Sequence, residues 1–128
     1  MRTIDECRDW LAADEGWVYY PDSVPMNYGR GVLYPDPGPG WKRGREVRSL
    51  AYGIPGHPIP ATLGAAAAAM PEGWSVKLWI ENGVCNGEAW GPGSLEKAPI
   101  VRADPSDERC FRFNLAVLVR EKIKENKQ

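Results

Sequence analysis

Trp74-Ser75-Val76-Lys77-Leu78-Trp79-Ile80-Glu81, then Asn82-Gly83, then Val84-Cys85-Asn86-Gly87-Glu88-Ala89-Trp90: this stretch decides the fold. Apolar residues alternate on both sides of Asn82-Gly83. An Asn-Gly pair between such runs is the strongest local signature of a β-hairpin, because both turn residues must tolerate positive φ. The segment therefore predicts an antiparallel hairpin over residues 74–90.

The two-residue turn also fixes which residues lie opposite one another, and so divides the hairpin into two faces. One face holds large aliphatic residues opposite small ones: Val76 with Ala89, Leu78 with Gly87 and Ile80 with Cys85. We expect the last helix of the chain to rest on this face. The other face holds Lys77 opposite Glu88 and Trp79 opposite Asn86. We expect it to be solvated or available to a partner, and an exposed Trp79 would indicate binding.

Downstream of the hairpin, the sequence predicts a third strand and a final helix. After the break at Gly91-Pro92-Gly93, residues 98–103 form the third strand. Asp104 is the expected cap of the final helix, and Pro105 suits its first turn. Acidic residues at its start and lysines at its end complement the helix dipole.

The final helix, residues 106–125, is apolar nearly all round. Between Cys110 and Val119 only Arg112 and Asn114 are polar. Such a helix must be covered on more than one side. The N-terminal region of the same chain and a second subunit, in a homodimer through this helix, are equally good candidates for the cover.

Upstream of the hairpin, two further helices and several short β segments are expected. Thr3 and Glu6 have capping-box spacing before a helix over residues 4–14, which Gly16 ends. Five consecutive alanines predict a short helix over 61–70 that Pro71 stops. Short or edge strands are expected at 17–20, 31–34 and 46–52, and the Pro/Gly-rich residues 35–40 predict an exposed loop.

The fold class that follows is α+β: an antiparallel sheet of three or more strands packed against helices. A helix–three strands–helix core occupies the C-terminal half, and an irregular Pro/Gly-rich β segment the N-terminal half. A chain of 128 residues suits a single domain spanning 1–128. There is no apolar run long enough for a membrane span and no secretion signal, so we expect a cytoplasmic protein.

The residues that usually carry chemistry are sparse. Cys7, Cys85 and Cys110 are widely spaced, which argues against disulfides and a zinc site, and His57 is the single histidine. No nucleophile motif, phosphate-binding glycine loop or metal-ligand set is present. We therefore expect no enzyme, no catalytic residue, no metal and no cofactor.

A cluster of arginine and aromatic residues is the strongest candidate for a ligand site. Guanidinium groups and aromatic rings are suited to phosphates and to stacked bases. The alternative is a solvated loop, which the formal net charge of −1 favours. The candidate ligand-binding residues, together with Trp79 of the hairpin, are Tyr28, Arg30, Tyr34, Trp41, Arg43, Arg45 and Arg48.

The layout of residues 58–124 resembles the small phage and prophage proteins called phage ABA-sandwich proteins. The matching features are the alanine-rich helix before Pro71-Glu72-Gly73-Trp74, the hairpin, the glycine–proline break and Val101-Arg102-Ala103-Asp104 before the last helix. The resemblance implies a non-enzymatic phage accessory protein in the cytoplasm of an infected bacterium. Such a protein would antagonise antiviral defence by binding a host defence protein or by sequestering a nucleotide signal.

Two other functions stay open at the level of sequence. Helix–three strands–helix is also the order of double-stranded RNA-binding modules, but Asp104, Asp107 and Glu108 would repel phosphates at the start of the final helix, so we do not expect a nucleic acid partner. The other function is that of a structural protein that oligomerises through the final helix.

Overall fold

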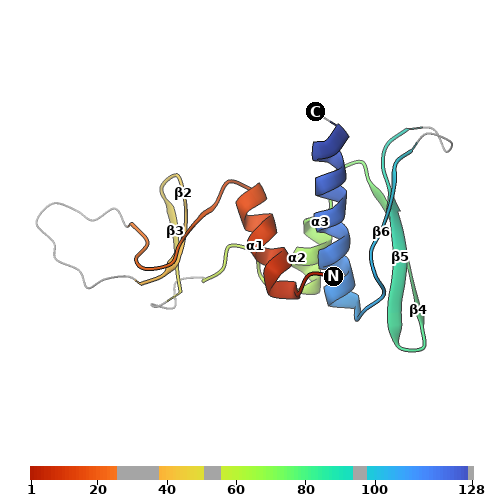
Figure 1. Cartoon of the computed structure of the whole chain (residues 1–128), viewed down its shortest axis with the longest axis horizontal. Helices are drawn as coiled ribbons and strands as arrows, with labels where there is room; N and C mark the ends of the chain where they lie inside the picture. The colour runs from red at the N-terminus through yellow and green to blue at the C-terminus, as the bar shows by residue number, and fades with distance from the viewer. Residues whose placement is uncertain (26–37, 51–55, 94–97, 127–128) are drawn as a thin grey trace, which may run out of the picture. The chain divides into compact units, whose positions relative to one another are not determined.

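The computed structural model describes residues 1–25, 38–50, 56–93 and 98–126 (Figure 1). Within these ranges the chain has the predicted α+β fold, with three helices and two three-stranded antiparallel sheets. The chain divides into two compact units, one made of residues 1–7 and 61–128 and the other of residues 8–60. We call them the major and the minor unit. The prediction of a single domain stays a prediction.

Helix α1, Ile4–Asp14, begins and ends as its sequence predicts. The Glu6 backbone N–H donates to the Thr3 hydroxyl at 3.1 Å, and the Thr3 N–H donates to the Glu6 carboxylate at 3.1 Å. These two bonds satisfy donors that the first helical turn leaves open. Gly16, with φ of 93°, takes the left-handed conformation that terminates the helix.

The sheet of the minor unit consists of β1 (Val18–Tyr20), β2 (Gly40–Arg43) and β3 (Glu46–Ser49), in that order. The expected strands at 17–20 and 46–52 are confirmed in shorter form, while 31–34 lies outside the described residues. Strand β2 was not predicted, and the exposed loop expected over 35–40 is wrong at its end, where Gly40 is buried. Gly40 pairs with Ser49 so closely that a Cβ would lie 2.4 Å from the Arg48 carbonyl oxygen.

Helix α2, Leu63–Ala68, is short and ends before Pro71, as predicted. The Thr62 hydroxyl accepts from the Ala65 N–H at 3.1 Å and caps its start. Two arginines of the last helix hold both ends of α2: Arg109 donates to the Ala61 carbonyl at 3.1 Å and Arg120 to the Ala69 carbonyl at 2.9 Å.

The predicted hairpin is present with its predicted register. Strands β4 (Ser75–Glu81) and β5 (Val84–Trp90) join at Asn82 and Gly83, whose φ values are 53° and 76°. Every expected opposite pair is found, from Glu81 with Val84 to Val76 with Ala89. The third strand, β6 (Ile100–Arg102), pairs with β5, so β5 is central and β4 is an edge strand.

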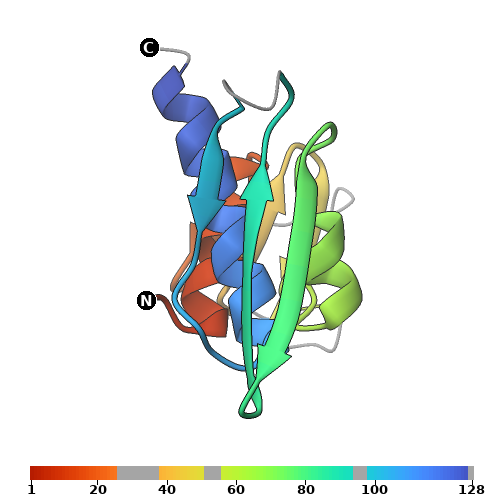
Figure 2. The ribbon, with the colours of Figure 1, turned by 90° about the vertical axis from the view of Figure 1, so that its right-hand side faces the viewer.

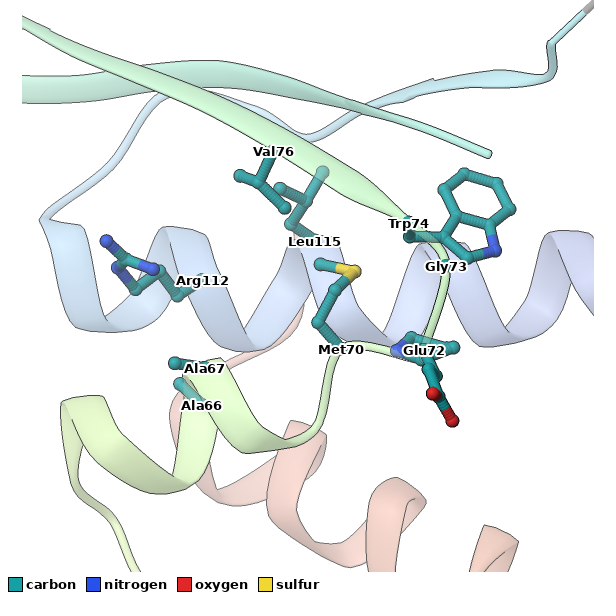
Figure 3. Close-up of a pocket in the computed structure, with 10 residues that line it drawn as sticks. Ala66, Ala67, Met70, Glu72, Gly73, Trp74, Val76, Arg112 and Leu115 are labelled. Carbon is teal, nitrogen blue, oxygen red and sulfur yellow. The ribbon is translucent and has the colours of Figure 1, made fainter. Parts of the chain in front are cut away.

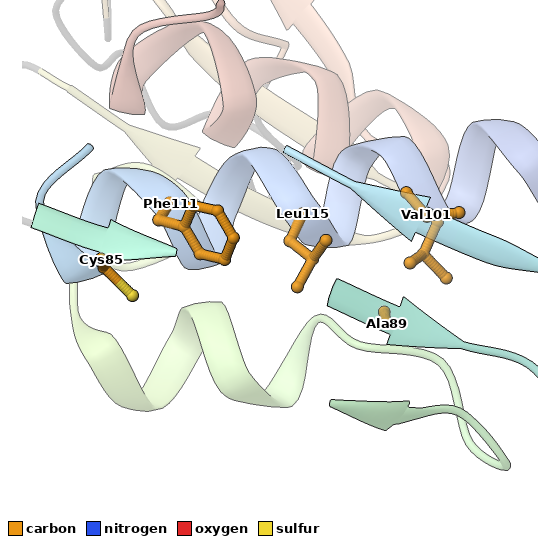
Figure 4. Close-up of a cluster of buried hydrophobic side chains, with 6 residues drawn as sticks. Cys85, Ala89, Val101, Phe111 and Leu115 are labelled. Carbon is orange, nitrogen blue, oxygen red and sulfur yellow. The ribbon is translucent and has the colours of Figure 1, made fainter. Parts of the chain in front are cut away.

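Helix α3, Glu108–Asn126, packs behind this sheet on β5 and β6 (Figure 2). Its Phe111, Leu115 and Val119 meet residues of the sheet in the core of the major unit (Figure 4). The partners on the sheet are Cys85, Ala89 and Val101.

The expectation that α3 covers the whole aliphatic face of the hairpin is wrong for β4. Because α3 rests on β5 and β6, the β4 residues extend beyond its cover. Leu78 still packs against the core, but Val76 is 37% exposed and Ile80 is 66% exposed. The edge strand therefore carries accessible aliphatic side chains.

The start of α3 is also corrected. Asp107, not Asp104, is the cap, because its carboxylate accepts from the Cys110 N–H at 3.1 Å. Residues before it stay extended since Ser106 exchanges two backbone hydrogen bonds with Cys85, at 2.7 and 3.2 Å. This pairing delays the helix by several residues.

The apolar side chains of α3 are buried within the single chain, including Phe113, Ala116 and Val117 at 0% exposure. Their burial therefore requires no second subunit, and the homodimer through residues 106–125 stays a prediction. No helix in the described ranges combines the length and apolar character needed to cross a membrane.

Asn114, a buried polar residue of α3, ties the N-terminus to the major unit. Its side-chain amide donates to the Arg2 carbonyl at 2.9 Å, and its oxygen accepts from the Arg2 N–H at 3.1 Å. We expect Asn114→Ala to lower the free energy of unfolding by about 1–3 kcal/mol, because both Arg2 groups lose their partner. Urea denaturation measures the change. Asn126→Ala, at the exposed end of the same helix, should change stability by less than about 0.5 kcal/mol, and equal losses in both variants would contradict this role.

Candidate functional site

The face of the β4-β5-β6 sheet opposite α3 is the candidate functional site, and we call it the open face. Figure 2 views the sheet from this side, with the helices of the major unit behind it. Side chains alternate along each strand, so those adjacent in sequence to the buried core residues point away from α3. The open-face residues are Ser75, Lys77, Trp79, Glu81, Val84, Asn86, Glu88, Trp90, Ile100 and Arg102.

Trp79 lies in a hollow of about 420 Å³ on the open face. It is 42% exposed, which the sequence alone left open. Asn86, Glu88 and Arg102 line the same hollow, as do Gly87, Ala103 and Pro105. Lys77 on β4 places its ammonium nitrogen 6.0 Å from the centre of the Trp79 ring, at the outer limit of a cation–π contact.

Arg102 is held in a defined position beside this tryptophan. Its Nε donates to the Glu88 carboxylate at 3.0 Å across the β5-β6 pair. The side chain is nevertheless 73% exposed, and within the described residues its two terminal nitrogens have no protein partner. A guanidinium held through Nε presents these two nitrogens, with their parallel donors, to solvent, which is the geometry that binds phosphate or carboxylate in a bidentate way.

A second hollow, of about 510 Å³, lies on the other side of Glu88. Trp90, Lys77 and Ile100 line it, together with Gly91, Pro92 and Gly93. Both hollows are therefore on one face and share a carboxylate. The open face combines two tryptophans, two cations and two anions in a surface that no helix of the major unit covers.

The described members of the arginine and aromatic cluster lie in the minor unit, and their role in binding stays a prediction. Trp41 is only 5% exposed and packs against the rings of Tyr19 and His57, with centroid distances of 5.1 and 5.0 Å. It is a core residue of this unit. Tyr28, Arg30 and Tyr34 lie outside the described residues.

Arg43 and Arg48 of this cluster make structural contacts. The guanidinium of Arg43 lies 4.6 Å from the centre of the buried Trp17 ring and donates to the Glu15 carbonyl at 3.2 Å. Arg43 and Arg48 share the Glu46 carboxylate, at 3.4 and 3.8 Å. Arg45 is exposed in the β2-β3 turn. These contacts hold the β2-β3 hairpin against the end of α1. They leave Arg43 and Arg48 fewer free hydrogen-bond donors for a ligand than Arg102 has.

The histidine and the cysteines are placed in structural positions. Both ring nitrogens of His57 are engaged: Nδ1 accepts from the Ile59 N–H at 3.0 Å, and Nε2 lies 2.7 Å from the Asp9 carboxylate. Nδ1 must therefore be unprotonated and Nε2 the donor. The three cysteines are buried and free. Among the described residues no group of three His, Cys, Asp or Glu side chains is arranged to hold a metal ion.

Two residues of the open-face site, Arg102 and Trp90, were not predicted as site residues from the sequence. Arg102 follows the inward-facing Val101, so strand alternation alone would have predicted that its side chain points outward. Its pairing with Glu88 could not be predicted, because the sequence between the ends of β5 and β6 contains no turn signature that fixes a register. Trp90 ends β5, and only the third strand beside it builds the second hollow.

Comparison with known protein families, with curated proteins and with solved structures finds no match to this chain. The resemblance to phage ABA-sandwich proteins therefore stays a prediction.

Burial raises the pKa of the Cys7 thiol to about 11, from an ordinary value of 9.0. The unfolded chain therefore loses this proton at lower pH than the folded protein, and stability should fall as the pH rises from about 9 to about 11. We expect the wild type to lose more free energy of unfolding over this range than Cys7→Ala, in urea titrations at several pH values. Parallel curves for the two proteins would contradict the shift.

Proposed function

We propose that this chain is a non-enzymatic binding protein that sequesters a nucleotide-type ligand on the open face. One observation carries the proposal: Trp79, exposed, and Arg102, with its terminal nitrogens facing solvent, line the same hollow. An aromatic face for a base and a guanidinium for a phosphate are the two elements that nucleotide recognition requires.

The other groups of the hollow suit the remaining parts of such a ligand. Asn86 offers an amide donor and acceptor, and Glu88 an acceptor, to the edge of a base that stacks on Trp79. Lys77 adds a second positive charge next to the ring. The volume of about 420 Å³ is within the range of small-molecule sites.

The biological role within the proposal comes from the resemblance to phage accessory proteins. A protein that captures a nucleotide signal in the cytoplasm of an infected bacterium would antagonise antiviral defence without catalysis. Binding of a host defence protein is the other form of the same role. The open face favours the nucleotide, because its hollows are of small-molecule size and because Arg102 is held in place without a ligand.

The alternatives from sequence gain less support. The start of α3 is acidic, with Asp107 as its cap and Glu108 in its first turn, so it is unsuited to a nucleic acid backbone. The burial of α3 within one chain removes the main reason for a structural oligomer through this helix.

Isothermal titration calorimetry with cyclic dinucleotides, cyclic oligonucleotides and ADP-ribose tests the proposal. We expect at least one to bind, and Trp79→Ala and Arg102→Ala each to weaken its binding about tenfold or more, because a stacked base or a charged hydrogen bond contributes roughly 1–3 kcal/mol. Arg45→Ala, an exposed arginine of the minor unit, is the matched control and should bind as the wild type does. The ligand should be recovered chemically unchanged by chromatography.

Failure of every nucleotide to bind would contradict the proposal. So would binding that Arg45→Ala weakens as strongly as Arg102→Ala, because the site would then lie in the cluster predicted from the sequence.

A further inference from the structure

The outer edge of β4 is open for backbone hydrogen bonding. The Cys85 N–H and carbonyl bond to Ser106, so the backbone of Cys85 points away from β4. Its opposite residue, Ile80, therefore shares no ladder bond with it, and the N–H and carbonyl of Ile80 point away from β5. Because the direction of the backbone groups alternates along a strand, the N–H and carbonyl groups of Val76 and Leu78 also point away from β5. Within the described residues no strand pairs with this edge.

The residues with outward backbone groups, Val76, Leu78 and Ile80, also have aliphatic side chains, which is unusual for an open edge strand. Val76 and Ile80 are accessible aliphatic residues, and Leu78 is half-buried. A long edge strand with exposed aliphatic side chains is a site for pairing with another strand, which proteins usually prevent by short edges, charges or a covering segment. β4 has seven residues, and its Val76 borders an open groove.

This groove lies between β4 and α2, with α3 as its floor, and has a volume of about 390 Å³ (Figure 3). Val76, Met70 and Leu115 point toward one another across it. Ala66 and Ala67 line the side formed by α2, and their small side chains keep the groove open. Met70 is unbranched and flexible, which suits it to pack around different apolar side chains.

We propose that this groove binds an extended peptide segment of a partner protein, which adds to β4 as a further strand. The backbone of the peptide would bond to the outward groups of Val76, Leu78 and Ile80. Every second side chain of the peptide would point toward α2, and those near Val76 would enter the groove beside Met70 and Leu115, so these residues are aliphatic.

Charge complementarity specifies the alternate side chains of the peptide. On the open face of β4, Lys77 and Glu81 lie either side of Trp79. An acidic peptide residue beside Lys77 and a basic one beside Glu81 pair favourably across the new ladder. The occupant is therefore a short extended segment in which aliphatic residues alternate with polar ones, including one acid and one base.

A bare segment fits this edge better than a second copy of the chain. In an antiparallel pair of β4 strands, the two-fold axis is perpendicular to the sheet and would keep both helix layers on the same side of the joined sheet. The α2 helix of the second copy would then approach the α2 that lines this groove. An extended segment carries no such helix.

Fluorescence polarisation with a labelled octapeptide tests the inference. The peptide alternates valine with threonine, and one glutamate and one lysine replace threonines. Ala67→Trp fills the groove from an exposed position of α2, and Ile80→Pro removes one outward donor at an edge position where proline is tolerated. We expect each to weaken binding about tenfold or more, whereas Ala68→Trp, exposed on α2 outside the groove lining, should bind as the wild type does.

Backbone methylation of the peptide separates strand addition from mere burial of apolar side chains. N-methylation of the alternate amides that face β4 should abolish binding, and N-methylation of the other set should not. The proposal would be overturned if the unmethylated peptide failed to bind. It would also be overturned if the two methylated peptides bound equally well, or if Ala67→Trp and Ala68→Trp changed binding equally. Self-association that Ile80→Pro removes would assign the edge to a second copy and would overturn it too. Nucleotide binding should be unchanged in Ala67→Trp, so the two proposals fail independently.

Discussion

The turn at Asn82-Gly83 is the constraint on which the rest of the structure depends. Both residues have positive φ, and a two-residue turn of this kind admits one register of β4 against β5. Because side chains alternate along a strand, a slip of one residue would turn one of the two strands over relative to the other. Either Cys85 and Ala89 would then leave the core under α3, or Trp79 would enter it.

The same register places residues of both proposed sites on β4. Its odd-numbered residues from Lys77 to Glu81 face the open side, where Trp79 lies near Arg102 in the proposed nucleotide site. Its even-numbered residues, Val76 to Ile80, carry the free backbone edge, and Val76 borders the groove beside α2. The nucleotide site therefore lies on the open face and the groove on the opposite face, and Lys77 is a residue of β4 that both proposals use.

Local chemistry made much of the fold predictable, and long-range pairing accounts for the errors. The bounds of α1 followed from the Thr3 and Glu6 cap, and the hairpin register from its turn. The start of α3 was misplaced because Ser106 pairs with the distant Cys85, and β2 was missed because a Pro/Gly-rich run precedes it. Of the candidate site residues, Trp79 is exposed, whereas Trp41 is buried by neighbours that no local pattern shows.

Amide hydrogen exchange along β4, followed residue by residue by NMR in the free protein, tests the central claim most directly. The register predicts alternation: slow exchange for Lys77, Trp79 and Glu81, whose amides bond to β5, and fast exchange for Val76, Leu78 and Ile80, whose amides face outward. Uniform protection along the strand, or alternation in the opposite phase, would contradict both the register and the open edge.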